Sequence, residues 1–428
     1  MSTNRSFHPG RLLIWGLFAL GLIVAPLVFR SSMALTMLSQ MGYVIIICLS
    51  YNMIFGQGGM LSFGHAVYTG AGGFAAVWAM NHVTAGQLPV PLPFIPLAGG
   101  LAGVLLAFVS GYVITKKAGT TFAMITLGIG ELVAACANMF PGLFGGDGGI
   151  TTDRTYSRFL GWNFGAQVQV YYLIAFYCFV CTALMYAFTG TPLGRMLNAV
   201  RDNPERVSFI GYNTQLVRWF SFIISGFFAG VGGALASINF EIVNAGDAFS
   251  GARSGSYLLF TFLGGAGFFF GPIIGAVLLV LASVVLSELT QAWLLYLGAA
   301  FLLMVMFAPG GIASLIMANQ RVIKAGHFGR LGLPYAGVFV TALAALFGVA
   351  GLIEMIYFRQ LGAGSGTAMK FMGWPLDVSS AGSWLAVTAV AVVGLGLFGL
   401  AWRHFARAWG EVQETIEARL NPAREAHA

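Results

Sequence analysis

Five polar side chains interrupt otherwise apolar stretches of this chain and are its first candidates for chemistry. They are Gln57, Ser62, His65, Glu131 and Asp147. An amide, a hydroxyl and an imidazole so close in sequence could bind a small polar solute by donating and accepting hydrogen bonds. A carboxyl group deep in an apolar run is usually paired or functional. The aspartate lies in a glycine-rich loop.

Each of these residues also has a purely structural interpretation. His65 could bond a backbone carbonyl at a helix end, and Asp147 could simply form a turn. Glu131 has no acidic or basic partner nearby in sequence, which favours a hydrogen bond to a neighbouring helix over proton transfer. The cysteines all lie in apolar stretches and are expected to be small core residues: Cys48, Cys136, Cys178 and Cys181. We therefore expect no catalytic residue and no metal site.

A further concentration of polar residues is the loop 191–213, TPLGRMLNAVRDNPERVSFIGYN. A threonine and a proline at its start suit the N-cap and the first position of a helix. The Asn203-Pro204 pair would end that helix, and Gly211 is a candidate left-handed C-cap of a second short turn. Apolar residues recur at helical spacing on one face: Leu193, Met196, Leu197 and Val200. The charged residues lie off that stripe: Arg195, Arg201, Asp202, Glu205 and Arg206. Such a loop could dock into a soluble partner or lie on lipid headgroups.

The composition excludes a soluble globular protein. Of the 428 residues, 58% are hydrophobic and only 8% are charged, whereas soluble domains carry about 25% charged residues. The chain has too few charges to cover a globule of this size in water, so we predict an integral protein of the lipid bilayer. The net charge of +7 is no indication of nucleic-acid binding, because basic residues of membrane proteins mostly mark cytoplasmic loops.

Apolar runs close to the ~20 residues needed to span a bilayer predict an all-α, polytopic membrane helical bundle. We expect about 10–12 transmembrane helices, some of them short or broken by glycine. The expected spans are Leu12–Phe29, Met33–Phe55, Gly64–Met80, Phe94–Ile114, Thr120–Met139, Val170–Phe188, Val217–Ile238, Gly255–Phe269, Gly271–Leu286, Ala292–Phe307, Tyr335–Ile356 and Ser383–Trp402. Glycine-rich turns at 57–73 and 264–275 fall in the two halves and suggest a diverged internal repeat. Close helix packing explains these glycines equally well.

The basic residues predict the orientation of the chain. If the N-terminus is cytoplasmic and the spans alternate, most basic residues fall inside: Lys116, Lys117, the loop 191–213, Arg321, Lys324, Arg330 and the tail from Arg403. Fewer fall outside: Arg30, Arg154, Arg158, Arg253, Arg359 and Lys370. Both termini are then cytoplasmic, provided that Gly255–Phe269 is a full crossing. The first apolar run is expected to be an uncleaved anchor rather than a signal peptide.

Several stretches, in this order, resemble one known family. They are GQGGMLSFGHAVYTGAGGFAA (56–76), TTFAMITLGIGEL (120–132), FGGDGGI (144–150), the loop 191–213, WFSFIISGFFAGVGGALAS (219–237), SGSYLLFTFLGGAGFFFGPIIGA (254–276) and LLMVMFAPGGIASLI (302–316). Together they resemble the permease subunits of ABC importers of branched-chain amino acids, most closely the LivM type. The resemblance covers about Met33 to Ile316 and leaves out Ala325 to Ala428.

The apolar runs and the extent of the resemblance together divide the chain into three parts, and the resemblance implies a function. The parts are an N-terminal anchor helix (1–32), a permease core (33–318) with the coupling loop 191–213, and a C-terminal extension (319–428) with two more membrane helices and an amphipathic cytoplasmic tail. The function would be translocation of branched-chain or related small amino acids across the bacterial inner membrane. No stretch reads GxxxxGK[ST], so the chain itself is expected to be no enzyme and to hold no cofactor.

The same resemblance implies the partners. ABC ATPase subunits would hold the ATP and Mg, a periplasmic binding protein would deliver the solute, and a second permease subunit, homologous or identical, would complete the pathway. The apolar stripe of 191–213 would seat in a groove on the ATPase, with Leu193, Leu197 and Val200 contributing most and the charged residues forming a rim. Substrates of the alternative classes, urea, short amides or small aromatic acids, remain open. A proton-coupled secondary transporter using Glu131 is the alternative in a different class.

Overall fold

The computed structural model describes residues 9–156, 161–290, 292–308, 310–324, 326, 328–361, 368–371 and 374–420. The contacts divide the chain into two compact units, which we describe separately. Unit 1 comprises Met1–Val285 and Phe301–Ala313, and unit 2 comprises Leu286–Ala300 and Ser314–Ala428. Helices dominate both units, which confirms the all-α prediction. Each of the twelve expected spans falls on a helix.

Within the described residues, eight helices are long and apolar enough to span a bilayer, or nine if one bent pair is counted as a single span. In chain order, the elements up to the end of unit 1's first segment are α1 (Pro9–Val28), α2 (Ser32–Ile54), α3 (Ala66–Thr84), η1 (Leu92–Phe94), α4 (Ile95–Ile114), α5 (Gly119–Met139), α6 (Pro141–Phe144), η2 (Gly146–Gly148), β1 (Ile150–Thr151), η3 (Arg154–Tyr156), α7 (Gln167–Thr189), α8 (Pro192–Asp202), α9 (Pro204–Phe209), α10 (Thr214–Phe240), β2 (Ile242–Val243), α11 (Ala245–Ala248), α12 (Gly251–Gly264) and α13 (Gly271–Leu281). The later elements are η4 (Ala282–Leu286), α14 (Ser287–Leu289), α15 (Trp293–Phe307), α16 (Gly311–Lys324), α17 (Phe328–Leu361), β3 (Ala368–Phe371), β4 (Trp374–Asp377) and α18 (Ala381–Leu420).

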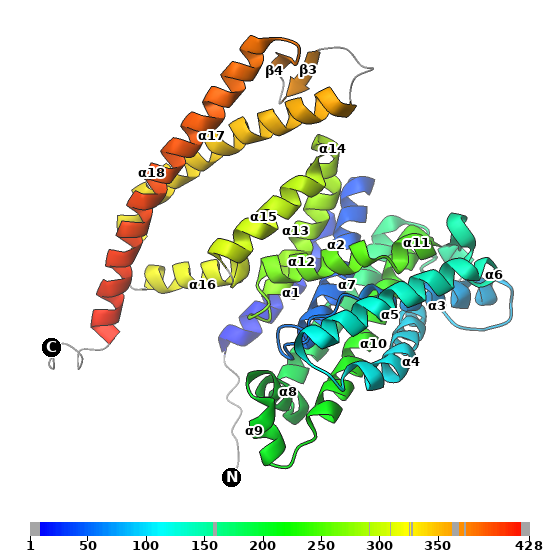
Figure 1. Ribbon diagram of the computed structural model, residues 1–428. Coiled ribbons are helices and arrows are strands. Elements are labelled where there is room, and N and C mark those ends of the chain that lie inside the picture. Colours follow the sequence, from blue (N-terminus) through cyan, green and yellow to red (C-terminus); the bar gives the residue numbers. More distant parts are fainter. Residues whose placement is uncertain are drawn as a thin grey trace. The chain divides into compact units, whose positions relative to one another are not determined.

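Helix α10 forms the centre of unit 1 and packs on α2, α3 and α4. Its 27 residues give a length of about 40 Å at ~1.5 Å per residue, so its two ends lie on opposite faces of the bundle. Glycines allow the close packing: a methyl group at Gly233 would overlap the carbonyl oxygen of Thr69 on α3, and one at Gly230 would overlap that of Gly99 on α4. Small residues let membrane helices approach in this way. Helices α8 and α9 lie together at one edge of unit 1 (Figure 1).

The two glycine-rich turns predicted as halves of a repeat lie against each other. A methyl group at Gly56 would overlap the carbonyl oxygen of Ala266. Helix α12 has 14 residues, or about 21 Å, and is shorter than the ~30 Å hydrocarbon core. It ends at Gly265, whose φ of +111° only glycine adopts readily. The predicted span Gly255–Phe269 is therefore a short helix followed by a turn, and α12 alone does not supply the full crossing that the predicted orientation requires.

Unit 2 is built on the helix pair α17 and α18, which run side by side (Figure 1). The strands β3 and β4 between them pair antiparallel. The tail that was predicted to be amphipathic is the C-terminal part of α18. There Val412 is buried against Val322 and Leu331, so part of its apolar face is covered by the chain itself.

The cysteines differ from the prediction at one position. Cys48, Cys178 and Cys181 are buried, as expected of small core residues, but Cys136 on α5 is exposed. The apolar stretch around it gave no sign of this, because a helix facing lipid or another subunit is apolar on its outer side as well.

Candidate functional site

The loop 191–213 folds as its capping residues predict. The Thr191 hydroxyl accepts a hydrogen bond from the Gly194 backbone N–H at 3.2 Å and so caps α8. The Asn203 side chain accepts from the Arg206 N–H at 2.9 Å and caps α9. Gly211 has φ +90°. These local rules fix two short helices in the predicted positions.

The apolar stripe of α8 faces its own chain. Leu197 is 0% exposed and Val200 is buried beside it, while Leu193 and Met196 are partly buried against the same core. In this conformation the stripe is not available to the groove of an ATPase. An amphipathic pattern indicates only that one face of a helix is covered, and here the helical bundle of the same chain covers it. The outward surface instead combines the charged residues with exposed apolar side chains, among which Phe209 is 88% exposed.

Arg201 fastens α8 to the first glycine-rich turn. Its Nη1 donates to the carbonyl oxygen of Gly56 at 2.5 Å, and its Nε donates to the Asp202 carboxylate at 3.0 Å. A methyl group added at Gly59 would stand 2.9 Å from the Arg201 side chain, and one added at Gly58 would stand 3.1 Å from Leu197. The loop 191–213 and the turn that begins the polar segment are thus in direct contact.

The polar segment that follows this turn is buried. His65 Nε2 and the Ser50 hydroxyl form a hydrogen bond of 2.9 Å, and Tyr51 bonds both backbone groups of Ser62, at 2.9 Å to its carbonyl and 3.2 Å from its N–H. Among the described residues, several buried polar atoms of this segment have no partner: Asn52 Oδ1, Gln57 Oε1, Ser62 Oγ and His65 Nδ1. Buried polar atoms of proteins are nearly always satisfied, by protein, water or ligand. Three of the predicted site residues, Gln57, Ser62 and His65, therefore lie in one polar segment.

Glu131 and Asp147 lie apart from that region. Glu131 is exposed on α5, and among the described residues no hydrogen bond to its carboxylate is found, so the predicted bond to a neighbouring helix is not observed. Asp147 is exposed in the loop after α6, where its backbone carbonyl accepts from Asn244 Nδ2 at 2.5 Å. The structure therefore ties this loop to the segment that follows α10.

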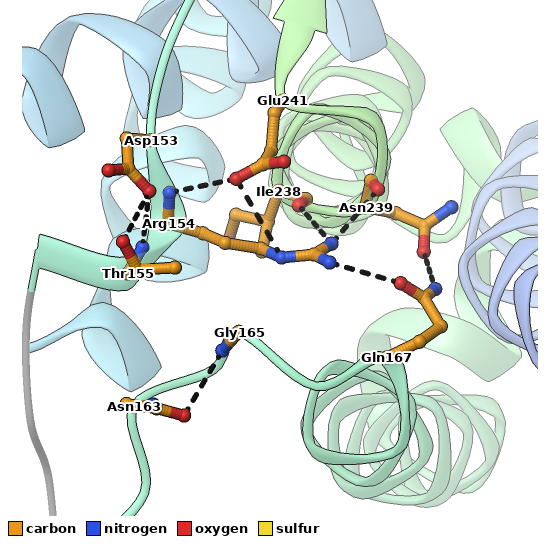
Figure 2. Close-up of polar contacts among 9 residues, drawn as sticks. All are labelled: Asp153, Arg154, Thr155, Asn163, Gly165, Gln167, Ile238, Asn239 and Glu241. Carbon is orange, nitrogen blue, oxygen red and sulfur yellow. Dashed lines mark hydrogen bonds and ion pairs between the residues drawn. The ribbon is translucent and has the colours of Figure 1, made fainter.

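The C-terminal end of α10, which we call the far end, carries a network centred on Arg154 (Figure 2). The guanidinium donates to the carbonyl oxygens of Ile238 at 3.5 Å and Asn239 at 3.2 Å and to Gln167 Oε1 at 3.2 Å. Its Nε lies 3.7 Å from the Glu241 carboxylate, which also accepts from the Arg154 backbone N–H at 3.0 Å. Carbonyls at a helix C-terminus lack intrahelical donors, and a basic side chain there satisfies them.

The strand pair at the far end completes this attachment. Ile150 pairs with Val243 and Thr151 with Ile242 in a short antiparallel ladder. Next to it, the Thr155 hydroxyl and then its backbone N–H donate to the Asp153 carboxylate, and these bonds hold the pKa of Asp153 below its usual range. The loop between α6 and α7 is thereby held on the end of α10.

Comparison with known proteins identifies the family. The family model of the branched-chain amino acid transport system permease component matches residues 33–309. The chain belongs to this family. It is 28% identical over 295 residues to the high-affinity branched-chain amino acid transport system permease protein LivM of Escherichia coli K12, covering 63% of this chain and 67% of that protein.

Two further relatives in this permease family agree. LivM of Salmonella typhimurium LT2 is 27% identical over 310 residues, covering 66% of this chain and 70% of that protein. A probable LivM of Methanocaldococcus jannaschii is 25% identical over 319 residues, covering 63% and 90%. No solved structure matches. The resemblance to LivM-type permeases is confirmed, and so is the prediction of a multi-pass membrane protein.

Two features of this permease were not anticipated as parts of a site. Arg154 and Arg253 were considered only as basic residues for orientation, yet each forms an ion pair, with Glu241 and Asp247 respectively. Gln167 lies 13 residues from Arg154, but its other partners, Ile238, Asn239 and Glu241, are 84 to 87 residues away in sequence, so no local pattern could reveal them. The six-residue spacing of the second pair was visible, but it crosses from one short helix to another.

Proposed function

We propose that this chain is the membrane permease subunit of an ABC importer for branched-chain or related small amino acids in the bacterial inner membrane. Separate ATPase subunits supply the energy, a second permease subunit completes the pathway and a periplasmic binding protein delivers the solute. Membership of the permease family supports this proposal, as do the names of the three relatives. The observation that carries it is the contact between the loop 191–213 and the polar segment.

The loop is built to move together with the bundle. Leu197 and Val200 are buried in the core, so α8 is packed on the bundle and does not hang free. Each fully buried side chain of this size contributes about 1.5–3 kcal/mol through apolar burial. A force applied to the loop therefore moves the neighbouring helices of the bundle before it detaches α8.

The outward surface of the loop provides the docking site for the ATPase. Three exposed apolar side chains follow one another at the end of α9: Phe209, Ile210 and Tyr212. Exposed charges surround them: Arg195, Arg201, Asp202, Glu205 and Arg206. An apolar centre with a polar rim is the usual composition of a protein interface. This surface takes the role that the sequence assigned to the stripe of α8.

Arg201 transmits the movement. Its guanidinium holds the Gly56 carbonyl at the start of the segment that contains Gln57, Ser62 and His65. When ATP binding moves the docked loop, this bond displaces the turn and with it the buried polar groups. A charge-assisted hydrogen bond is stronger and more directional than a neutral one, which suits this role.

Reconstitution tests the function. We expect uptake of labelled leucine into proteoliposomes only when the permease, the ATPase subunits encoded by neighbouring genes, the binding protein and ATP are all present. The liposomes without ATPase, energised by a pH gradient, are the control. Uptake in that control would contradict the proposal and favour the secondary transporter.

A pair of arginine variants tests the transmission. Arg201→Met keeps the aliphatic stem but removes the donor to Gly56, and we expect ATP hydrolysis to continue while leucine uptake falls about tenfold or more, as expected for loss of a charge-assisted bond. Arg195→Met removes another exposed charge of α8 as a matched control and is expected to have a smaller effect. Equal uptake by both variants would show that the bond to Gly56 transmits nothing.

A further inference from the structure

Unit 1 contains a cavity of about 410 Å³ that belongs to none of the predicted site residues. It lies between α2, α3, α10 and the short helices α11 and α12. One side is apolar and is formed by Ile47, Ala236, Phe240, Ile242 and Val243. The volume falls in the ~300–1,000 Å³ range of small-molecule sites.

The lining of the cavity also includes three glycines, Gly70, Gly73 and Gly233, and the hydroxyl groups of Thr69 and Ser237. The glycines allow close packing around the cavity, because a methyl group at Gly73 would overlap Ser237 Oγ and one at Gly233 would overlap the Thr69 carbonyl oxygen. The helix α3, which supplies Gly70 and Gly73, begins directly after His65. The cavity and the buried polar segment are therefore connected by one helix.

An ion pair lies in the wall of this cavity. Arg253 Nε donates to Asp247 Oδ1 at 3.1 Å, and its Nη2 donates to the other carboxylate oxygen. The side chains are 36% and 65% exposed, respectively, so both charges remain accessible. Arg253 also lies near the hydroxyl groups of Tyr257 and Tyr43. A fixed cation and a fixed anion thus stand side by side next to an apolar surface.

We infer that this cavity binds a zwitterionic α-amino acid with an aliphatic side chain. The Arg253 guanidinium binds the carboxylate of the solute, Asp247 binds its ammonium group and the apolar wall takes the side chain. This inference rests on the proposed function and names the site through which the solute passes.

The chemistry of the pair fits that ligand. In a free amino acid, the ammonium and carboxylate groups are both attached to the α-carbon. The two opposite charges therefore lie close together, as do those of Asp247 and Arg253. The planar fork of arginine binds a carboxylate through two parallel hydrogen bonds. Opening the ion pair costs little, because exposed pairs contribute almost nothing to stability. The solute replaces each broken contact with one of the same kind.

The alternative is that the pair only fixes α11 to α12. Analogues of leucine distinguish the two readings. The full-length chain in lipid nanodiscs is titrated with L-leucine, with 4-methylpentanoate, which lacks the ammonium group, and with 3-methylbutan-1-amine, which lacks the carboxylate. We expect leucine to bind at least about tenfold more tightly than either analogue, because both charges must be matched. Equal binding of all three, or no binding of leucine, would overturn the inference.

Single variants test which of the two charged residues binds which group of the solute. Asp247→Asn is expected to remove the preference for leucine over 4-methylpentanoate without weakening the binding of that analogue, because Arg253 remains. Arg253→Gln is expected to remove the preference for leucine over the amine. Asp153→Asn, an exposed acid outside the cavity, is the control and should bind leucine as the unchanged chain does. If a variant does not fold, the analogue series on the unchanged chain still decides.

The same variants in the reconstituted importer separate this inference from the proposed function. Full ATP-driven leucine uptake by both Asp247→Asn and Arg253→Gln would overturn the cavity site and leave the importer intact. Absence of ATP-driven uptake by the unchanged chain would instead contradict the importer, while the nanodisc titration would still decide what the cavity binds.

Discussion

The two ends of α10 are held by different kinds of interaction. At the N-terminal end, the preceding loop is packed through buried apolar side chains such as Leu197 and is joined to the bundle by the bond from Arg201 to Gly56. At the far end, Arg154 alone donates to two carbonyls, an amide and a carboxylate. Apolar packing has no preferred direction, whereas hydrogen bonds fix distances and angles.

This difference suits an element that transmits movement. In the proposed importer, the loop before α10 moves with the bundle through its apolar packing and the bond from Arg201, while the bonds of Arg154 fix the far end. The following four predictions test this contrast, beginning with the largest effect on stability.

Replacement of Leu197 by aspartate should prevent the loop 191–213 from packing on the bundle. The site is fully buried, and a charge without a partner there costs more than the ~2–5 kcal/mol of a buried Leu→Ala change. The thermal unfolding midpoint and the yield of monodisperse protein measure the effect. A folded Leu197→Asp variant that hydrolyses ATP without transport would mean that the stripe faces the ATPase after all.

Replacement of Gly233 by alanine should destabilise the packing of α10 on α3. The added methyl group overlaps the Thr69 carbonyl oxygen on α3, and overpacking of this kind costs about 1–3 kcal/mol. Gly255→Ala is the matched control, since nothing lies within 4 Å of an added methyl group there. Equal unfolding midpoints of the two variants would show that the α3–α10 contact gives way easily.

Replacement of Arg154 by methionine should loosen the far end. The aliphatic stem remains, but the carbonyls of Ile238 and Asn239 lose their donor, at a cost of about 1–3 kcal/mol. Limited proteolysis should then cut the loop between α6 and α7 more quickly than in the unchanged chain. Unaltered proteolysis would show that the strand pair β1–β2 holds this loop without the arginine.

Replacement of Phe209 by serine should leave stability within about 0.5 kcal/mol, because the side chain is exposed and such changes are usually neutral. The coupling of ATP hydrolysis to transport should nevertheless fall, since the centre of the docking surface is lost. Thermal unfolding and the uptake assay together measure this. Normal coupling would exclude the surface around Phe209 as the docking site.

Local signals in the sequence predicted the helices well. The Thr191 cap and the Asn203-Pro204 break depend only on near neighbours in the sequence, so the limits of α8 could be predicted. The cap that Asn203 forms on α9 was not predicted. The twelve expected spans all fall on helices, although α12 is too short to cross by itself. The predicted boundaries at 32 and 318 and the roles of the site residues stay predictions.

The sequence could not show what covers each apolar face or which distant residues meet. The stripe containing Leu197 looks the same whether a partner or the chain itself covers it. The cavity depends on the packing of α3 against α10, which brings Gly233 beside Thr69, a residue 164 positions earlier in the chain. Contacts of this kind depend on the whole bundle rather than on a local pattern.

The single accessible sulfur atom among the cysteines of the native chain is useful in the laboratory. Cys136 is exposed on α5, whereas Cys48, Cys178 and Cys181 are buried and will react slowly. A maleimide-linked spin label or fluorophore can therefore be attached to this helix without any engineering. In an assembly of two identical permeases, the label-to-label distance would report how far the subunits separate during each cycle of turnover.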